Sequence, residues 1–154
     1  MEVNYHAPLV LRRELEVFAP PQMVWDWVSR VDLWKDWHGD ISQSVWTGTP
    51  GPHGEFRLRI RKVLGVAAKV ESWYEPRELG WVGYSWSTTW RQVIRLDGDF
   101  RRTLVRIEGS VEGRVYDYAP VRSVVSGQLV RLNEMWLGSL KTQLESEKFR
   151  AGRH

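Results

Sequence analysis

The sequence predicts an α+β domain made of one curved antiparallel sheet of about seven strands, two short helices and one long C-terminal helix. Three observations predict this fold. Residues 9–18 alternate apolar and charged side chains, residues 41–113 divide into short runs separated by turn residues, and residues 121–144 carry an apolar side chain at every third or fourth position. A long amphipathic helix on the concave side of the sheet buries all these apolar faces together.

The N-terminal part predicts a strand followed by two short helices. Residues 9–18 form the strand, and its apolar face carries one charge, Arg13. Pro20 and Pro21 end the strand, because proline has no N–H to donate to a sheet, and they favour the start of a helix. In residues 22–40, valine and tryptophan then recur at helical spacing, which predicts the two helices.

The middle of the chain predicts an antiparallel meander. Apolar and charged residues alternate most regularly where Phe56, Leu58 and Ile60 are interleaved with three arginines. This pattern predicts that one face of the strand is buried and the other is exposed to solvent. Glycine, proline, serine, threonine and aspartate separate the runs. The six runs are residues 41–48, 54–64, 66–75, 79–87, 90–97 and 102–113.

The last third predicts one long helix that begins near Pro120. Its apolar stripe includes Leu132, Trp136 and Leu140. These side chains lie four residues apart, so we expect them to face the sheet together.

Composition excludes several classes of function. The 154 residues are 42% hydrophobic and 27% charged, which fits one globular domain over residues 1–154 with a core at about residues 9–147. The chain has no cysteine, which excludes thiol catalysis and disulfides. The net charge of +3 does not call for nucleic acid. No apolar run approaches the roughly 20 residues of a membrane span, and no secretory signal pattern is present, so we expect a cytoplasmic protein.

The histidines do not predict a metal site. They are His6, His38, His53 and His154, and no two of them are spaced to share a helix face. We expect His38 to lie in a surface loop. The sequence has neither a Gly-x-Ser-x-Gly elbow nor a glycine-rich phosphate loop. We therefore expect no metal and no other cofactor.

Ten tryptophans are spread along the chain. Two interpretations stay open. The rings can fill a solid core, or they can line an apolar cavity that binds a ligand.

Five motifs occur in order between residues 9 and 147. They are APPQMVWDWV at 19–28, DLWKDW at 32–37, Gly-Glu-Phe at 54–56, Leu-Gly-Trp at 79–81 and Ser-Leu-Lys at 139–141 in the closing helix. In this order and at these separations the chain resembles the START-like helix-grip (SRPBCC) superfamily. It is most similar to the polyketide cyclase/dehydrase and lipid-transport branch.

The resemblance implies a deep apolar cavity between the sheet and the long helix, with Trp81 turned inward. Polar groups available to such a cavity are few, with Ser72, Gln92 and Thr103 as the main candidates, so no catalytic residue is assigned. A solid core would use the same residue types. The predicted ligand-binding residues are Phe56, Leu58, Val70, Trp81, Trp90, Gln92, Ile94, Val105, Leu132, Trp136 and Leu140.

The function expected from these features is binding or transport of a hydrophobic small molecule or lipid. Two alternatives remain: an enzyme resembling a polyketide cyclase/dehydrase, and an interaction protein resembling the chaperone activators of the superfamily. Whether the chain turns over a substrate is left open, although binding alone is favoured. We expect no nucleic-acid partner and no integral membrane segment, and the oligomeric state is left open.

Overall fold

The computed structural model describes the backbone of residues 1–151 and the side chains of residues 1–146. All six predicted runs of the meander form strands, and the predicted fold class is confirmed. The elements are β1 (Leu9–Val17), α1 (Pro21–Val28), the 3-10 turn η1 (Val31–Leu33), α2 (Trp34–Trp37), β2 (Ile41–Trp46), β3 (Glu55–Ile60), β4 (Leu64–Tyr74), β5 (Glu78–Ser85), β6 (Thr88–Gly98), β7 (Thr103–Glu112), the 3-10 turn η2 (Arg114–Asp117) and α3 (Ala119–Ala151).

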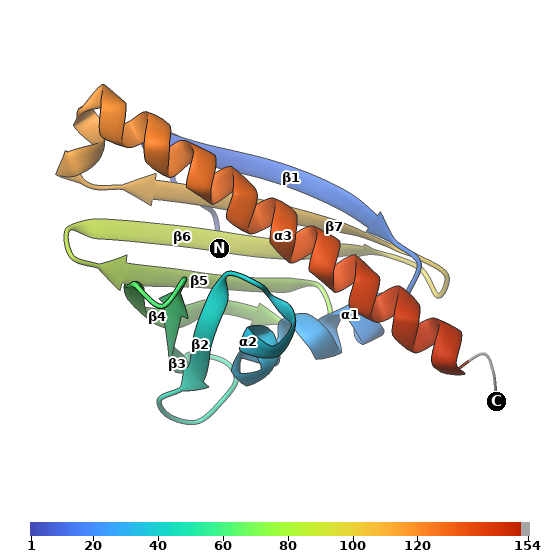
Figure 1. Ribbon diagram of the computed structural model, residues 1–154. Coiled ribbons are helices and arrows are strands. Elements are labelled where there is room, and N and C mark those ends of the chain that lie inside the picture. Colours follow the sequence, from blue (N-terminus) through green and yellow to red (C-terminus); the bar gives the residue numbers. More distant parts are fainter. Residues whose placement is uncertain (152–154) are drawn as a thin grey trace.

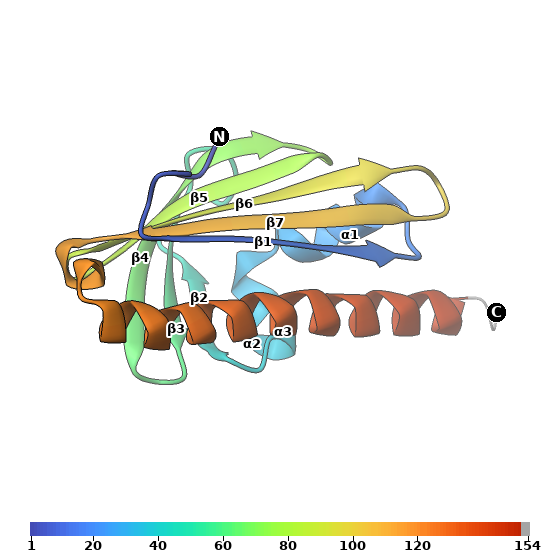
Figure 2. The same ribbon diagram turned by 90° about the horizontal axis from the view of Figure 1, so that it is seen from above.

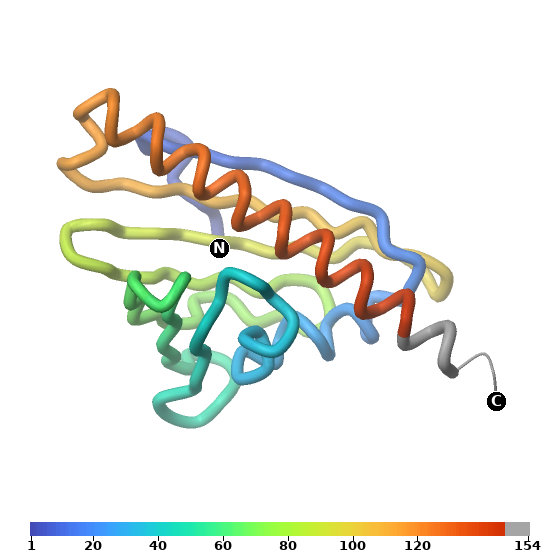
Figure 3. The backbone as a smooth tube through the Cα atoms, in the orientation of Figure 1, coloured from blue at the N-terminus to red at the C-terminus, as the bar shows by residue number. Residues whose placement is uncertain are grey.

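The seven strands form one antiparallel sheet in the order β1-β7-β6-β5-β4-β3-β2 (Figure 1). The first strand therefore pairs with the last, and the remaining strands follow one another as hairpins. Seen from above in Figure 2, the sheet curves so that β2, β3 and β4 turn toward α3, which runs along the concave side beneath β1 and β7. The tube in Figure 3 shows the same path, with α1 and α2 at one end of the curved sheet.

Helix α3 follows the predicted apolar stripe. Leu129, Leu132, Trp136, Leu140 and Leu144 are all buried. The opposite face carries charged and polar side chains, as expected for a helix that covers a sheet. Despite the length of α3, no helix in the described part of the chain is apolar enough to cross a membrane.

Aromatic rings fill the middle of the interior. The Trp34 ring lies 5.7 Å from the Phe56 ring, 6.4 Å from the Trp81 ring and 5.0 Å from the Trp136 ring, measured between centroids. Trp81 lies 4.7 Å from Trp90. Most of these pairs meet edge to face, the arrangement that aromatic quadrupoles favour. Here the tryptophans form a packed core and not the wall of a deep cavity.

The one charge on the inner face of β1 is satisfied by α3. Arg13 pairs in register with Ile107 of β7, and its Nε lies 3.8 Å from Oε1 of Glu134. Both side chains stay partly exposed at the edge of the sheet. The arginine therefore keeps its charge in water while it bridges sheet and helix.

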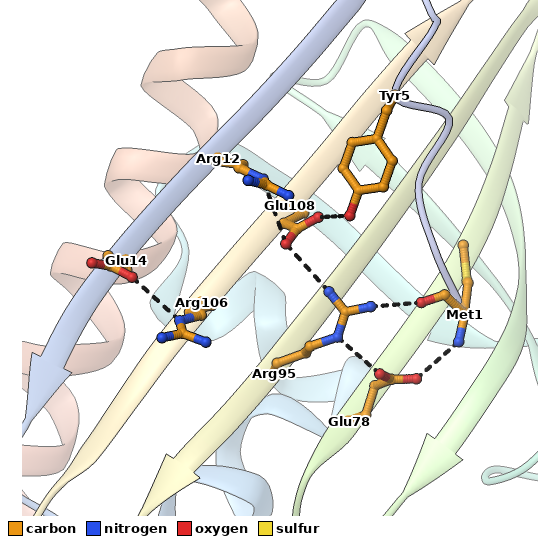
Figure 4. Close-up of polar contacts among 8 residues, drawn as sticks. All are labelled: Met1, Tyr5, Arg12, Glu14, Glu78, Arg95, Arg106 and Glu108. Carbon is orange, nitrogen blue, oxygen red and sulfur yellow. Dashed lines mark hydrogen bonds and ion pairs between the residues drawn. The ribbon is translucent and has the colours of Figure 1, made fainter.

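Residues 1–7 lie across the convex face of the sheet, opposite α3 (Figure 4). Arg95 of β6 is the centre of their contacts: it bonds Glu78 at 3.0 Å, Glu108 at 3.3 Å and the backbone oxygen of Met1 at 2.8 Å. Two carboxylates and a carbonyl thus satisfy one guanidinium. This network covers a face that an antiparallel sheet often leaves to solvent.

Candidate ligand-binding site

A small cavity opens between the first half of α3 and the sheet. Its volume is about 120 Å³. A cavity of ~150 Å³ holds one benzene ring, and sites for drug-sized ligands span roughly 300–1,000 Å³. The space therefore matches one ring of a ligand. Its lining residues are Asp40, Ile60, Arg61, Leu64, Thr88, Trp90, Val111, Tyr116, Val125, Gln128, Leu129 and Leu132.

Sheet register and helix periodicity place the apolar walls. Trp90 of β6 pairs with Val111 of β7, and alternation along both strands turns these side chains toward α3. Leu129 and Leu132 lie on the buried stripe of α3 and form the opposite wall. An apolar ring between them contacts side chains on both sides.

The mouth of the cavity is polar. The hydroxyls of Thr88 and Tyr116 lie 3.0 Å apart and share a hydrogen bond. Asp40 lies 3.4 Å from Arg61 of the β3–β4 turn and 3.7 Å from Arg131 of α3. This carboxylate therefore holds the rim of the sheet and the helix together beside the opening.

Two buried polar atoms lie near Gly109, which is not one of the residues that line the cavity. Nε1 of Trp90 and Oε1 of Gln92 have no hydrogen-bond partner among the described residues. Both lie 3.8 Å from the position that a Cβ atom on Gly109 would take, as does the backbone oxygen of Arg91. The three atoms therefore surround that position at ordinary van der Waals distance.

A larger hollow on the outside of the sheet is a weaker candidate. It measures about 610 Å³ and is lined by charged side chains of β1 and β7. These charges already pair with each other: Arg12 lies 3.6 Å from Glu108, and Arg106 lies 3.3 Å from Glu14 (Figure 4). Apart from Ile107 its lining residues are charged, so an ionic ligand must displace existing partners.

Two of the predicted ligand-binding residues, Trp90 and Leu132, line the small cavity. The other nine lie deeper in the interior and fill it, so their part in binding stays a prediction. All nine are buried: Phe56, Leu58, Val70, Trp81, Gln92, Ile94, Val105, Trp136 and Leu140. Trp81 points inward, as the resemblance implied, and contacts Trp34 and Trp90.

None of the three predicted polar groups is among the residues that line the cavity, although Gln92 is buried on the same face of β6 as Trp90. Ser72 points the other way, because a bulge in β4 shifts the register between Val70 and Ser72. Its Oγ lies 2.5 Å from the position of a Cβ on Gly80, beside Met1 on the convex face. Thr103 is buried but donates its hydroxyl to the backbone oxygen of Ala19 at 2.7 Å. Ser72 as a cavity residue was therefore wrong.

The prediction that His38 lies in a surface loop was also wrong, because its side chain is buried and only 1% exposed. Its Nδ1 accepts the backbone N–H of Asp40 at 3.1 Å, so the proton sits on Nε2, which donates to the backbone oxygen of Leu132 at 3.1 Å. Burial lowers the pKa of His38 below its ordinary value, although the hydrogen bond to Leu132 and the charge of Asp40 oppose this shift. His38 therefore links the segment after α2 to α3 as a neutral ring.

Sequence reasoning missed the residues of the mouth. Thr88 stood in a predicted turn and Tyr116 just after the last predicted strand, and neither position carries a periodic signal. Their aromatic and hydroxyl chemistry is visible in the sequence, but their convergence needs the pairing of β6 with β7. In the described part of the chain, no group of three or more histidine, aspartate or glutamate side chains is placed to hold a metal ion.

Comparison with known proteins agrees with this geometry. Residues 9–145 match the family described as polyketide cyclase / dehydrase and lipid transport. No curated protein sequence matches the chain.

Solved structures share the fold at low sequence identity. The Zhui aromatase/cyclase of Streptomyces sp. R1128 is 13% identical and superposes with a TM-score of 0.78 over 89% of this chain and 93% of its own. A START superfamily protein of Mycobacterium smegmatis is 15% identical, with a TM-score of 0.75 over 89% of this chain and 97% of its own. A protein of Thermus thermophilus, TTHA0849, is 12% identical, with a TM-score of 0.77 over 90% of this chain and 99% of its own. With the match over residues 9–145, the chain belongs to the polyketide cyclase / dehydrase and lipid transport family, and its sheet and long helix have the fold of these solved structures.

Proposed function

We propose that this protein binds a hydrophobic small molecule by taking one ring of it into the cavity beside Trp90. The observation that supports this most is the cavity itself, which measures about 120 Å³ and is lined mostly by apolar side chains. Its place between sheet and α3 agrees with the family match, whose description includes lipid transport and polyketide chemistry.

The packed interior limits the size of the ligand. Trp34, Trp81 and Trp136 occupy the space deeper between sheet and helix. Enclosing a whole lipid would require these side chains to leave close packing, which is unfavourable. We therefore propose that any larger ligand keeps the rest of its skeleton outside the mouth, near Tyr116 and Leu64.

Titration with p-xylene, a single apolar ring, tests this proposal. Binding should change the fluorescence of Trp90, and isothermal titration calorimetry gives the affinity. Val125 lines the cavity, whereas its neighbour Val124 is exposed on the outer face of α3. Val125→Phe should reduce p-xylene affinity about tenfold or more by filling the space, while the matched Val124→Phe should leave it unchanged. Absence of binding to the unmodified protein would refute the proposal.

A second candidate is an enzyme that removes water from a polyketide-like chain and closes a ring. The family description and the aromatase/cyclase among the similar structures favour it, and the hydroxyl pair of Thr88 and Tyr116 supplies polar groups at the cavity. Incubation with a linear poly-β-ketone thioester mimic, followed by mass spectrometry for loss of water, tests turnover. Tyr116→Phe should abolish that loss if the hydroxyl takes part, while p-xylene binding persists.

Other sequence predictions stay predictions. These are a single domain over residues 1–154, a cytoplasmic location, the absence of a cofactor and of a nucleic-acid partner, and the interaction-protein alternative. A stable protein partner purified together with a protein whose cavity binds no ligand would support that alternative.

A further inference from the structure

A separate hollow lies on the convex face of the sheet, on the side away from α3. It measures about 420 Å³ and extends over strands β2 to β5. One row of paired residues crosses it from β2 to β5, namely Val45, Arg57, Ala67 and Tyr84. All four side chains are exposed, so the row faces solvent and not the core.

Small residues form the floor of this hollow, and longer side chains form its walls. Gly65 and Ala67 of β4 lie in the middle. Arg57 and Arg59 of β3 lie on one side, paired in register with these two small residues. Tyr84 of β5 lies on the other side, about 10 Å from β3 across two strand spacings. The hollow is therefore a trough along β4, and we refer to it as the β4 trough.

The two arginines of the β4 trough have no partner. Neither guanidinium of Arg57 and Arg59 forms an ion pair or a hydrogen bond in the described part of the chain, whereas Arg95 and Arg106 on the same face bind carboxylates. Arg57 and Arg59 are the only charged residues among the described residues that line the trough. They lie two positions apart on one strand, a distance of about 7 Å. Two positive charges at this spacing match two negative charges at a similar spacing.

Trp86 lies at the end of the trough in an unusual position. It is fully exposed, and its backbone φ is 54°. Because Ser85 pairs with Thr88, Trp86 is the first residue of a two-residue hairpin loop, where a positive φ favours glycine. A tryptophan there adds neither burial nor a favourable turn conformation to the fold. Tryptophan, tyrosine and arginine are the residues that most often dominate binding at protein interfaces, and the trough brings all three together.

We propose that the β4 trough binds an extended acidic segment of another protein, in which two carboxylate residues flank one apolar residue. Side chains alternate along an extended chain, so a segment lying along β4 turns its first and third side chains to one wall and its second to the other. The two carboxylates, also about 7 Å apart, accept hydrogen bonds from Arg57 and Arg59. The apolar side chain between them contacts Tyr84 and Trp86.

The charges around the trough favour a short acidic segment over a polyanion. In the next row of the sheet, Glu55 of β3 pairs in register with Lys69 of β4, so this row adds no net charge. The positive charge of the lining is that of two arginines. Nucleic acid and an anionic lipid surface present continuous arrays of phosphates, which need a wider basic surface. The trough and the ring-binding cavity lie on opposite faces of the sheet, so this inference does not depend on the proposed function.

Titration with a capped peptide, Gly-Glu-Leu-Glu-Gly, tests the inference. Nuclear magnetic resonance of isotope-labelled protein should show shifts at the backbone amides of β3, β4 and β5 and at the Trp86 indole. The peptide Gly-Gln-Leu-Gln-Gly should bind about three- to tenfold more weakly, because two partly exposed ion pairs are lost. Gly-Glu-Glu-Leu-Gly has the same composition as the first peptide and should also bind more weakly, because its adjacent carboxylates point in opposite directions.

Variants of the trough separate binding from folding. Arg57→Met and Arg59→Met should each weaken peptide binding about threefold or more, whereas Arg106→Met, on the same face but outside the trough, should not. Trp86→Gly should also weaken binding without lowering the urea midpoint, because glycine is favoured at a positive φ. Phe100, an exposed aromatic residue at the β6–β7 turn, is the matched control, and Phe100→Gly should leave peptide binding unchanged.

The outcomes that would overturn the inference are distinct from those of the p-xylene titration. Absence of shifts with Gly-Glu-Leu-Glu-Gly, or equal affinity for the glutamine peptide, would refute it. Tighter binding of a thymidine oligonucleotide or of phosphatidylglycerol vesicles than of the acidic peptide, at the same salt concentration, would also refute it. The affinity for p-xylene should be the same with and without the peptide, so failure of this inference leaves the proposed function standing.

Discussion

Replacing Trp136 by alanine tests whether α3 closes a filled interior. Trp136 is buried, and its ring lies 5.0 Å from Trp34 and 5.3 Å from Trp37. Removing a buried tryptophan side chain costs roughly 3–5 kcal/mol through lost transfer free energy and the space left behind. The two edge-to-face pairs add about 0.5–1.5 kcal/mol each beyond burial. We therefore expect Trp136→Ala to lower the free energy of unfolding by about 4–8 kcal/mol.

Urea denaturation, followed by far-ultraviolet circular dichroism, measures this loss. With a denaturant slope of about 2 kcal/mol per molar urea, the midpoint should fall by ~2–4 M. Trp86 is the matched control, because its side chain is fully exposed at the β5–β6 turn. Trp86→Ala should change the free energy of unfolding by no more than about 0.5 kcal/mol. A midpoint shift for Trp136→Ala below ~0.5 M would mean that its ring already borders a void, and the filled interior would be refuted.

Three further results are expected. In the unfolded chain, His38 takes up a proton near pH ~6.5. In the folded protein the pKa of His38 is lowered, so it takes up the proton only at lower pH. The free energy of unfolding should therefore fall as the pH drops from about 7 to about 5. Urea midpoints measured across this pH range should change less in His38→Gln than in the unmodified protein. An equal change in both proteins would contradict the assignment of the pH dependence to His38. Arg95→Met should lower stability by about 1–3 kcal/mol in thermal unfolding because Glu78 and Glu108 lose a partner, while the exposed Arg57→Met should not. Gly83→Ala should cost about 1–3 kcal/mol by overpacking against Val66. Gly109→Ala, whose added Cβ would meet no atom nearer than 3.8 Å, should cost less, and equal destabilisation of the two variants would contradict the overpacking at Gly83.

The sequence predicted the architecture well, because the signals that define it are local. Alternation in residues 56–61 assigned the two faces of β3, and a repeat of three to four residues assigned the face of α3. Both signals come from the geometry of a single element. Pairing of β1 with β7 is not local, and no strand order was predicted from the sequence.

The errors share a physical cause: each depended on a contact between distant residues. The bulge that turns Ser72 outward sits opposite Gly80, and a run of alternating residues gives no sign of a one-residue insertion. The buried His38 donates a hydrogen bond to the backbone oxygen of Leu132, which lies 94 residues away in the sequence. Cavity volume was equally invisible, since a core and a cavity wall use the same residues. Trp34 and Trp90 are both large aromatic residues, yet one lies in the packed core and the other lines the space.

The division of the interior explains how a widely used fold acquires a particular ligand. The curved sheet and long helix create space along their whole length, and side chains decide how much of it remains open. At the α1 and α2 end, Trp34 and Trp136 fill it with edge-to-face contacts. At the η2 end, Trp90, Val111 and Leu129 border a cavity of about 120 Å³, room for one ring. Substitutions at the cavity end should therefore alter ligand binding, whereas those at the filled end should alter mainly stability.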